Sequence, residues 1–329
     1  MFWRVVYQNY VMTLVRCINN DFITDKKTKL RLKKILGIPP SEGLSLEDLI
    51  FNWRLKIGKH IYKKKYTAKD IADAMQKCGM KKGSVVFIQS RWAEFYNCTS
   101  SPTEVIEEIL KVIGPEGTLG MACMPYIKEG KIFNVKRTPT NSGLLAEAFR
   151  KYPGVKRSIN IKHSVCAIGP QADYLVSEHY LSETPWDKKS PYYRLYELNA
   201  LNFGLGLGKY WMGTIIHCAD SLLKDELPYY HDMFYPEKTE YRYVDYDGQE
   251  KSYWNYDMPQ TGPKKRIGSY FLCRKIVRKY LHGSFQQVSN MQIICFEAKE
   301  LLATTISLGR KGINSYWTPS KRGYKFENK

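Results

Sequence analysis

The sequence has no long hydrophobic run and no closely spaced pair of cysteines. No uninterrupted apolar stretch approaches the roughly 18 residues needed to span a bilayer, and the first residues lack the apolar core and cleavage site of a signal peptide. The eight cysteines among 329 residues are separated by long, irregular gaps, and none forms a Cys-x-x-Cys pair. We therefore expect a cytoplasmic protein with free thiols, and neither a disulfide scaffold nor a metal site.

Acidic residues are scarce relative to basic ones. The chain has 32 Asp and Glu against 51 Lys and Arg, which gives a formal net charge of +19. Such a charge predicts attraction to nucleic acid, an anionic membrane face or small phosphorylated ligands, but it predicts no fold. No zinc-finger, RRM or KH pattern accompanies the basic patches, so we expect no nucleic-acid partner. The 25 tyrosines supply flat apolar area with a polar tip, which suits carbohydrate and nucleotide sites.

Two regions differ in pattern. Residues 1–65 are basic and predict a helical extension, with an amphipathic helix over residues 1–17 and a second helix beginning at Ser45, the predicted cap. This extension suits peripheral contact with the inner face of an anionic membrane, packing on the main domain, or assembly into a homo-oligomer, and we favour packing or assembly. The main domain is expected to cover residues 66–329.

The main domain alternates helical and strand patterns, which predicts an α/β fold with a central mixed sheet flanked by helices. The region of residues 235–270 is rich in tyrosine and charge and predicts an antiparallel hairpin, with Asp247-Gly248 as its turn. Predicted helices cover residues 67–78, 103–113, 144–152, 271–280 and 297–307, and predicted strands cover residues 85–89, 118–123, 165–168 and 202–207.

One histidine lies in a dense polar neighbourhood. His163 follows the basic run that begins at Lys156, precedes Ser164, and stands at the mouth of a short apolar strand that ends in Gly169-Pro170. Histidine is the side chain best suited to accept a proton near neutral pH. Its place beside cations and hydroxyls favours chemistry on a charged substrate.

Six segments in order and spacing resemble the aminoglycoside 3-N-acetyltransferase family across roughly residues 66 to 310. The resemblance implies an antibiotic N-acetyltransferase-like α/β fold, distinct from the GNAT acetyltransferase fold. It also implies an acyl-CoA-dependent N-acyltransferase that uses acetyl-CoA or another acyl-CoA and no metal. The segments are residues 83–90, 110–119, 138–150, 156–170, 190–197 and 214–220.

The resemblance assigns the general base to His163. A carboxylate is then needed to orient the imidazole or to attract the acceptor ammonium, and Glu197 and Asp220 are both candidates. We favour Asp220 for substrate contact, because it ends a segment in which family members carry glutamate; aspartate is one methylene shorter. His217 and Ser164 are further candidates for substrate binding.

The resemblance also places the CoA site after the strand of residues 85–89, where family members usually carry His-Ser-Ser and this chain carries Gln-Ser-Arg. A second group of hydroxyl and glycine residues leads into a helix, whose N-terminus favours phosphate or thioester oxygen. The predicted cofactor-binding residues are Gln89, Ser90, Arg91, Thr138, Ser142, Gly143 and Ser190.

The predicted reaction moves an acetyl group from acetyl-CoA to the amine of an amino sugar. Because aminoglycosides are polycations and the chain carries +19, charge favours a nucleotide-linked amino sugar used for cell-surface polysaccharide. The alternative acceptor is an aminoglycoside antibiotic. An alternative hypothesis is a non-catalytic protein whose basic surface binds polyanions or membranes. This hypothesis predicts steeply salt-dependent binding and no acyl-CoA turnover.

Overall fold

The computed structural model describes residues 46–208, 210–228, 230–231, 235, 237–256 and 277–314. The chain divides into two units, residues 1–63 and 64–329. In the first unit, α3 (Leu46–Ile61) begins where the sequence predicts a helix start. The predicted helix over residues 1–17 and most of the one over residues 271–280 lie outside the described residues.

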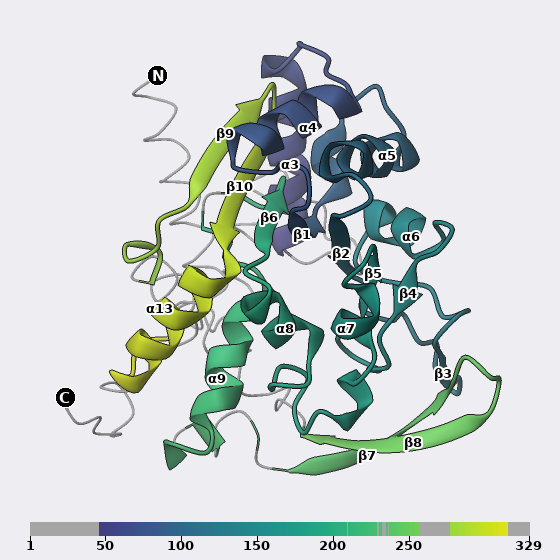
Figure 1. The fold of residues 1–329 in the computed structure, drawn as a ribbon. Coiled ribbons are helices and arrows are strands. Elements are labelled where there is room, and N and C mark those ends of the chain that lie inside the picture. Colours follow the sequence, from purple (N-terminus) through teal and green to yellow (C-terminus); the bar gives the residue numbers. More distant parts are fainter. Residues whose placement is uncertain are drawn as a thin grey trace, which may run out of the picture. The chain divides into compact units, whose positions relative to one another are not determined.

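A mixed sheet forms the centre of the second unit (Figure 1), and its strands follow the order β4–β5–β2–β1–β6–β10–β9. The central strand β1 pairs in parallel with β2 and β6, whereas every other pairing in this sheet is antiparallel. The strands are β1 (Val85–Ser90), β2 (Thr118–Ala122), β4 (Lys156–Arg157), β5 (Val165–Ile168), β6 (Leu201–Leu205), β9 (Ser284–Val288) and β10 (Met291–Glu297).

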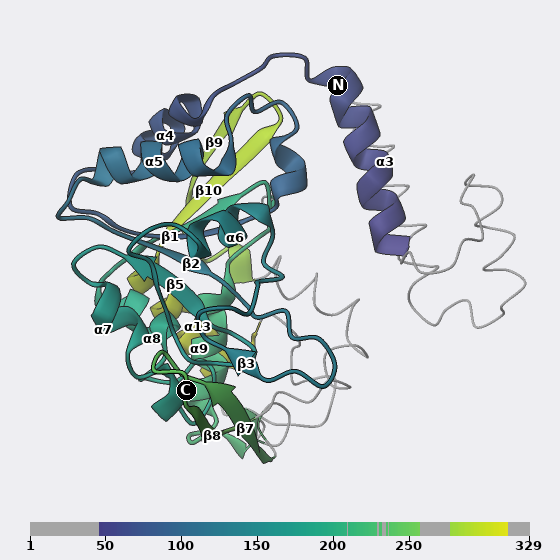
Figure 2. The ribbon, with the colours of Figure 1, turned by 90° about the vertical axis from the view of Figure 1, so that its right-hand side faces the viewer.

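Helices cover both faces of this sheet and bury a separate apolar core on each (Figure 2). The helices α4, α5 and α6 pack on one face, and α7, α8, α9 and α13 contribute to the core on the other. These helices are α4 (Ala68–Lys77), α5 (Pro102–Ile113), α6 (Leu144–Arg150), α7 (Ala172–Val176), α8 (Pro191–Glu197), α9 (His217–Leu223) and α13 (Ala298–Arg310), with short 3-10 turns η1 (Trp92–Phe95), η2 (His179–Leu181) and η3 (Thr214–Ile216). The predicted fold class, a central mixed sheet flanked by helices, is confirmed.

Local sequence signals explain where the helices α4 and α5 begin. Thr67 caps α4 in a capping box with Asp70, and Ser101 caps α5 in another with Glu104. Each box satisfies backbone N–H groups that the first helical turn leaves unpaired. Gly79, at φ +103, then ends the α4 segment in a conformation that other residues rarely adopt. The prediction of a helix from residue 67 to 78 is confirmed.

A second, three-stranded sheet contains the predicted hairpin. The strands β7 (Lys238–Val244) and β8 (Glu250–Tyr256) pair antiparallel, and β3 (Phe133–Asn134) adds to β7. Gly248, at φ +85, allows the tight turn and its N–H donates to the Asp245 carbonyl over 3.1 Å. One face of the hairpin packs on Phe133, Val135 and Ile159 through two buried tyrosines, Tyr243 and Tyr253.

Two further features of the described residues concern membrane-spanning helices and the state of the cysteines. None of their helices combines the length and hydrophobicity needed to cross a bilayer. Their six cysteines are free thiols, and five of these are buried: Cys78, Cys123, Cys166, Cys218 and Cys295.

Gly204 in β6 gives a test of the packing beside the sheet. A Cβ at this position would lie 2.4 Å from the Trp211 ring. We expect Gly204→Ala to lower the free energy of unfolding by about 1–3 kcal/mol through overpacking, as measured by denaturant titration. Because Trp211→Leu removes the ring, the alanine should cost less in the Trp211→Leu background. An equal cost in both backgrounds would contradict this explanation.

Candidate active site

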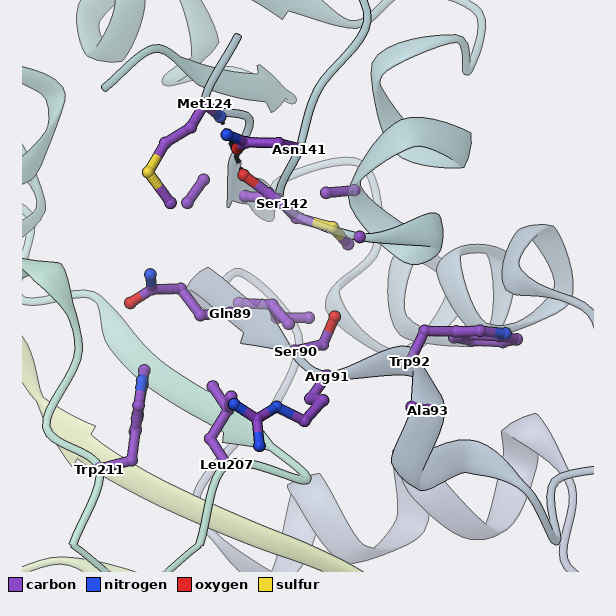
Figure 3. A pocket seen from close by; sticks show the side chains of 15 residues that line it. Gln89, Ser90, Arg91, Trp92, Ala93, Met124, Asn141, Ser142, Leu207 and Trp211 are labelled. Carbon is purple, nitrogen blue, oxygen red and sulfur yellow. Dashed lines mark hydrogen bonds between the residues drawn. The ribbon is translucent and has the colours of Figure 1, made fainter. Parts of the chain in front are cut away.

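A pocket of about 440 Å³ opens at the carboxyl ends of the parallel strands β1 and β2 and beside the segment that follows β6 (Figure 3). Ligands of α/β proteins commonly bind at this edge of a sheet. The lining residues are Ile88, Gln89, Ser90, Arg91, Trp92, Ala93, Met121, Ala122, Met124, Asn141, Ser142, Gly143, Ala146, Leu207 and Trp211.

Gln89 joins this pocket to a distant segment of the chain. Its side-chain Nε2 donates to Thr214 Oγ1 over 2.8 Å, and its Oε1 accepts from the Thr214 backbone N–H over 2.9 Å. Figure 3 shows Gln89 and Ser90 between Ser142 on one side and Trp211 on the other. The end of β1 is therefore fixed against η3, the turn that leads into α9.

The opposite wall is shaped by Ser142 and Gly143. The Ser142 hydroxyl accepts from the Met124 backbone N–H over 2.9 Å, which ties this wall to the end of β2. Gly143 precedes α6 at φ +99, and nothing lies within 4 Å of the position that a Cβ would take. The wall therefore presents backbone atoms and a hydroxyl group to the pocket.

Two of the predicted cofactor residues lie outside this pocket. The buried Thr138 hydroxyl accepts from the Asn134 backbone N–H over 2.8 Å. The fully buried Ser190 caps α8 and accepts from the Tyr193 N–H over 3.2 Å. The structure thus brings five of the seven together, namely Gln89, Ser90, Arg91, Ser142 and Gly143.

His163 lies in a tightly closed loop between β4 and β5. The Asn160 side-chain oxygen accepts from the backbone N–H groups of Lys162 and His163, over 3.1 and 2.8 Å. The Tyr192 hydroxyl donates to the His163 carbonyl over 3.2 Å. These bonds fix the backbone from which the imidazole projects.

The imidazoles of His163 and His217 both contact the ring of Trp186. The ring of His163 is 4.4 Å from the Trp186 ring, and that of His217 is 4.8 Å from it. The Nδ1 of His163 is buried and has no hydrogen-bond partner. Burial, with smaller contributions from His217, His179 and Lys162, lowers the pKa of His163 from its usual value to about 3. The ring is therefore neutral at physiological pH.

Asp220 lies next to His217. Its Oδ2 is 3.4 Å from His217 Nδ1, and both residues belong to α9, one helical turn apart. The Asp220 side chain is only 4% exposed, and burial raises its pKa, against the opposing effect of His217. Because α9 follows η3, this His–Asp pair begins three residues after Thr214, the partner of Gln89.

The other predicted substrate and catalytic residues have different surroundings. Glu197 is exposed at the end of α8 and accepts from the Tyr174 hydroxyl over 2.6 Å. Ser164 is fully buried; its hydroxyl donates to the Cys123 carbonyl over 2.6 Å and accepts from Arg157 Nε over 2.9 Å. Of the two candidate carboxylates, Asp220 is therefore the one that lies within the histidine–tryptophan cluster.

Sequence reasoning missed both tryptophans that shape this region. Trp186 contacts both imidazoles, and Trp211 forms part of the pocket wall. The only available signal was the run Thr184-Pro185-Trp186-Asp187, a bulky aromatic among turn-forming residues. Across the described residues, no group of three or more His, Cys, Asp or Glu side chains is placed to hold a metal ion.

A family model described as aminoglycoside 3-N-acetyltransferase matches residues 87–308, which contain the pocket, His163 and Asp220. The chain belongs to this family. One curated relative is the aminoglycoside N(3)-acetyltransferase IV of a Salmonella species, which is 29% identical over 153 residues. That match covers 46% of this chain and 56% of the relative, so the chain spans little more than half of the relative's length.

Solved structures share the fold. The aminoglycoside acetyltransferase AAC(3)-Xa matches with a TM-score of 0.63 at 19% identity, over 81% of this chain and 99% of that one. A structure of AAC-IIIb in a binary complex with CoASH matches with a TM-score of 0.61 at 18% identity, over 78% and 99%. These similarities confirm the family fold expected from the sequence.

Proposed function

We propose that this protein is an acetyl-CoA-dependent N-acetyltransferase that acetylates an amine of an aminoglycoside. The observation that carries the proposal is the family match over residues 87–308. The curated relative of this family also carries the name of an aminoglycoside N(3)-acetyltransferase. Sequence analysis favoured a nucleotide-linked acceptor on the basis of net charge, but net charge does not describe the charge at one site, and nothing in the comparisons supports that acceptor.

The pocket suits the CoA thioester. Its volume lies in the range of small-ligand sites, and it combines apolar walls with a few polar groups. Arg91 supplies a cation for a phosphate, and Ser90 and Ser142 supply hydroxyls. Leu207 and Trp211 offer apolar surface to the pantetheine arm.

The chemistry requires a neutral amine and a polarised thioester. We propose that the acceptor amine reacts in its neutral form, after its ammonium has lost a proton to solvent, and that His163 accepts the second proton as the nitrogen attacks the acetyl carbonyl carbon. The new C–N bond forms, the C–S bond breaks, and CoA leaves as a thiolate that takes up a proton. His163 is neutral in the structure, which is the state from which a base acts.

His217 and Asp220 are proposed to receive the acceptor. The contact of Asp220 with Nδ1 fixes the imidazole so that its other nitrogen faces away from the carboxylate. A carboxylate beside the site also attracts a cationic amine. Glu197 remains a second candidate carboxylate, although it is bonded to Tyr174 on the protein surface.

The domain assignment also remains a proposal. We assign the acyltransferase to residues 66–329 and packing or assembly to the basic extension of residues 1–65. The division of the chain between residues 63 and 64 supports this assignment.

Thiol release from acetyl-CoA tests the proposed function. We expect release with gentamicin- or kanamycin-type acceptors and none with dTDP- or UDP-linked amino sugars, each measured with a thiol reagent and a no-acceptor blank. Mass spectrometry of the acceptor should show the added acetyl group. Release only with nucleotide-linked sugars would overturn the acceptor, and no release with any acceptor or acyl-CoA would overturn the enzyme.

A further inference from the structure

Arg157 is a buried cation that has no carboxylate partner among the described residues. The residue is only 3% exposed. Its guanidinium donates to three neutral oxygens: Nε to Ser164 Oγ, Nη1 to the Thr138 carbonyl and Nη2 to the Cys123 carbonyl. Burial lowers its pKa. A buried charge without an opposite charge costs free energy, so a more specific role than stability is indicated.

The three acceptors of Arg157 belong to three different parts of the site. Cys123 follows β2 and precedes Met124, which lines the pocket. Thr138 precedes the segment of Asn141, Ser142 and Gly143 that forms the facing wall. Ser164 directly follows His163. A single side chain therefore connects both the end of β2 and this pocket wall to the loop of the proposed base.

The contacts between Arg157, Ser164 and Cys123 form a closed ring. The Ser164 hydroxyl accepts from Arg157 and donates to the Cys123 carbonyl, which also accepts from Arg157 Nη2. Each group fixes the other two, and such networks make side-chain positions unique when every member is paired. The flat face of the guanidinium lies over the Phe133 ring at 5.1 Å.

The β7–β8 hairpin region holds the same loop from the outside. The Tyr246 hydroxyl accepts from the Arg157 backbone N–H over 2.6 Å and donates to the Arg157 carbonyl over 2.9 Å. The Tyr253 hydroxyl accepts from the Ile161 N–H over 2.8 Å. The loop from Arg157 to Ser164 is therefore fixed from both sides.

We propose that Arg157 is a positioning residue that, with Ser164, sets the place of His163 relative to the cofactor pocket. The catalytic consequence rests on the proposed function, whereas the positioning itself does not. Ser164, which the sequence suggested for substrate binding, acts in this proposal through the buried ring and not through contact with the acceptor.

Arginine is needed here because its planar guanidinium presents N–H groups in a fixed fork. Lysine keeps the charge but concentrates its donors on one nitrogen, so it cannot reach three acceptors on three segments at once. Arg157→Lys therefore separates charge from geometry. Ser164→Ala removes only the link next to His163 and leaves the two carbonyl contacts of Arg157 in place.

Turnover of these two variants gives the first test. We expect kcat to fall on the order of 10–100-fold in both, since small misplacements of a catalytic group cost rates of this size. In Ser164→Ala the KM for acetyl-CoA should change little. Arg194→Lys is the matched control, because Arg194 is a similarly buried arginine that pairs with Glu178 and the Tyr174 carbonyl. Among the described residues it makes no hydrogen bond to the His163 loop. It should retain near-wild-type kcat.

Titration of His163 gives a second test that needs no acceptor. The groups that face its ring are Lys162 on its own loop, His179 in η2 and His217 in α9, with the Trp186 ring tilted against it. In ¹³C-histidine-labelled protein, assigned with His163→Gln, the wild-type signal should not titrate near neutral pH. In Arg157→Lys and Ser164→Ala the loosened loop admits water, and the pKa should rise toward about 6.5, the usual value.

The outcomes separate the two proposals. An unchanged His163 titration together with unchanged kcat in the folded variants would overturn the positioning role. A shifted titration in a protein that turns over no acceptor would support positioning and overturn the proposed function. Should Arg157→Lys fail to fold, Ser164→Ala decides the question alone.

Discussion

Replacing His163 with alanine is expected to lower kcat about 10³-fold, within the range of roughly 10²–10⁴ that a general base contributes. The reason is that the His163 ring is neutral and its buried Nδ1 has no hydrogen-bond partner in the structure. Acetyl-CoA should bind with unchanged affinity, since His163 does not line the pocket that we assign to it. Steady-state thiol release and calorimetric titration of acetyl-CoA measure the two effects.

A surface histidine gives the control for this variant. The His282 side chain is 94% exposed, and its Nδ1 lies 2.7 Å from Glu300 Oε1. His282 is not one of the residues of the proposed site. His282→Ala should keep wild-type kcat. Near-wild-type turnover in His163→Ala would refute the assignment of the base.

The pH dependence of the wild-type enzyme follows from the same environment. A base acts in its unprotonated form, and with a pKa of about 3 His163 is unprotonated at every pH at which the enzyme would be assayed. The profile of kcat/KM should therefore show no limb from His163 between about pH 5 and 8. A limb near pH 6.5 that disappears in His163→Gln would contradict this expectation.

Elements with complete local signals were predictable from the sequence. The helix α4 carries its cap, its capping box and its terminating glycine within a dozen residues, and β5 is bounded by Ser164 and Gly169-Pro170. In contrast, β9 (Ser284–Val288) was not predicted. It is a polar edge strand, Ser-Phe-Gln-Gln-Val, that gains its conformation by pairing with β10 and has little hydrophobic pattern of its own.

The same limit applies to the site. Gln89, Ser90 and Arg91 are consecutive at the end of a buried strand, and the pairing of His217 with Asp220 follows from a spacing of three in a helix. Such placements are local and were available from the sequence.

The roles of the serine hydroxyl groups could not be predicted from the sequence in this way. A serine can line a pocket, cap a helix or close a buried ring, and Ser142, Ser190 and Ser164 do one of these each. The choice depends on which distant backbone atoms the fold brings within 3 Å or so of the oxygen. The contact of Trp186 with two imidazoles that are 23 and 31 residues away in sequence is equally non-local.

Asp220→Asn is expected to lower kcat/KM for a cationic acceptor on the order of 100-fold, because removing the charge beside His217 leaves its imidazole less well oriented and the ammonium less attracted. The KM of acetyl-CoA should stay the same. Glu197→Gln is the matched control, a carboxylate of the surface that accepts from Tyr174, and it should retain most activity. The reverse result would exchange the roles of the two carboxylates.

Stability gives Asp220→Asn a second, independent signature. Because burial raises the pKa of Asp220 in the folded protein, its contribution to stability is complete below the unfolded pKa of about 3.9 and is lost as pH rises through the folded pKa. Above the folded pKa the ionised carboxylate is thus a cost, and asparagine should there leave the free energy of unfolding unchanged or higher. As pH falls toward 4, wild type should gain on the variant. A carboxylate retained at a cost in stability is retained for function, whereas a loss of stability at neutral pH with full turnover would mark Asp220 as a purely structural residue.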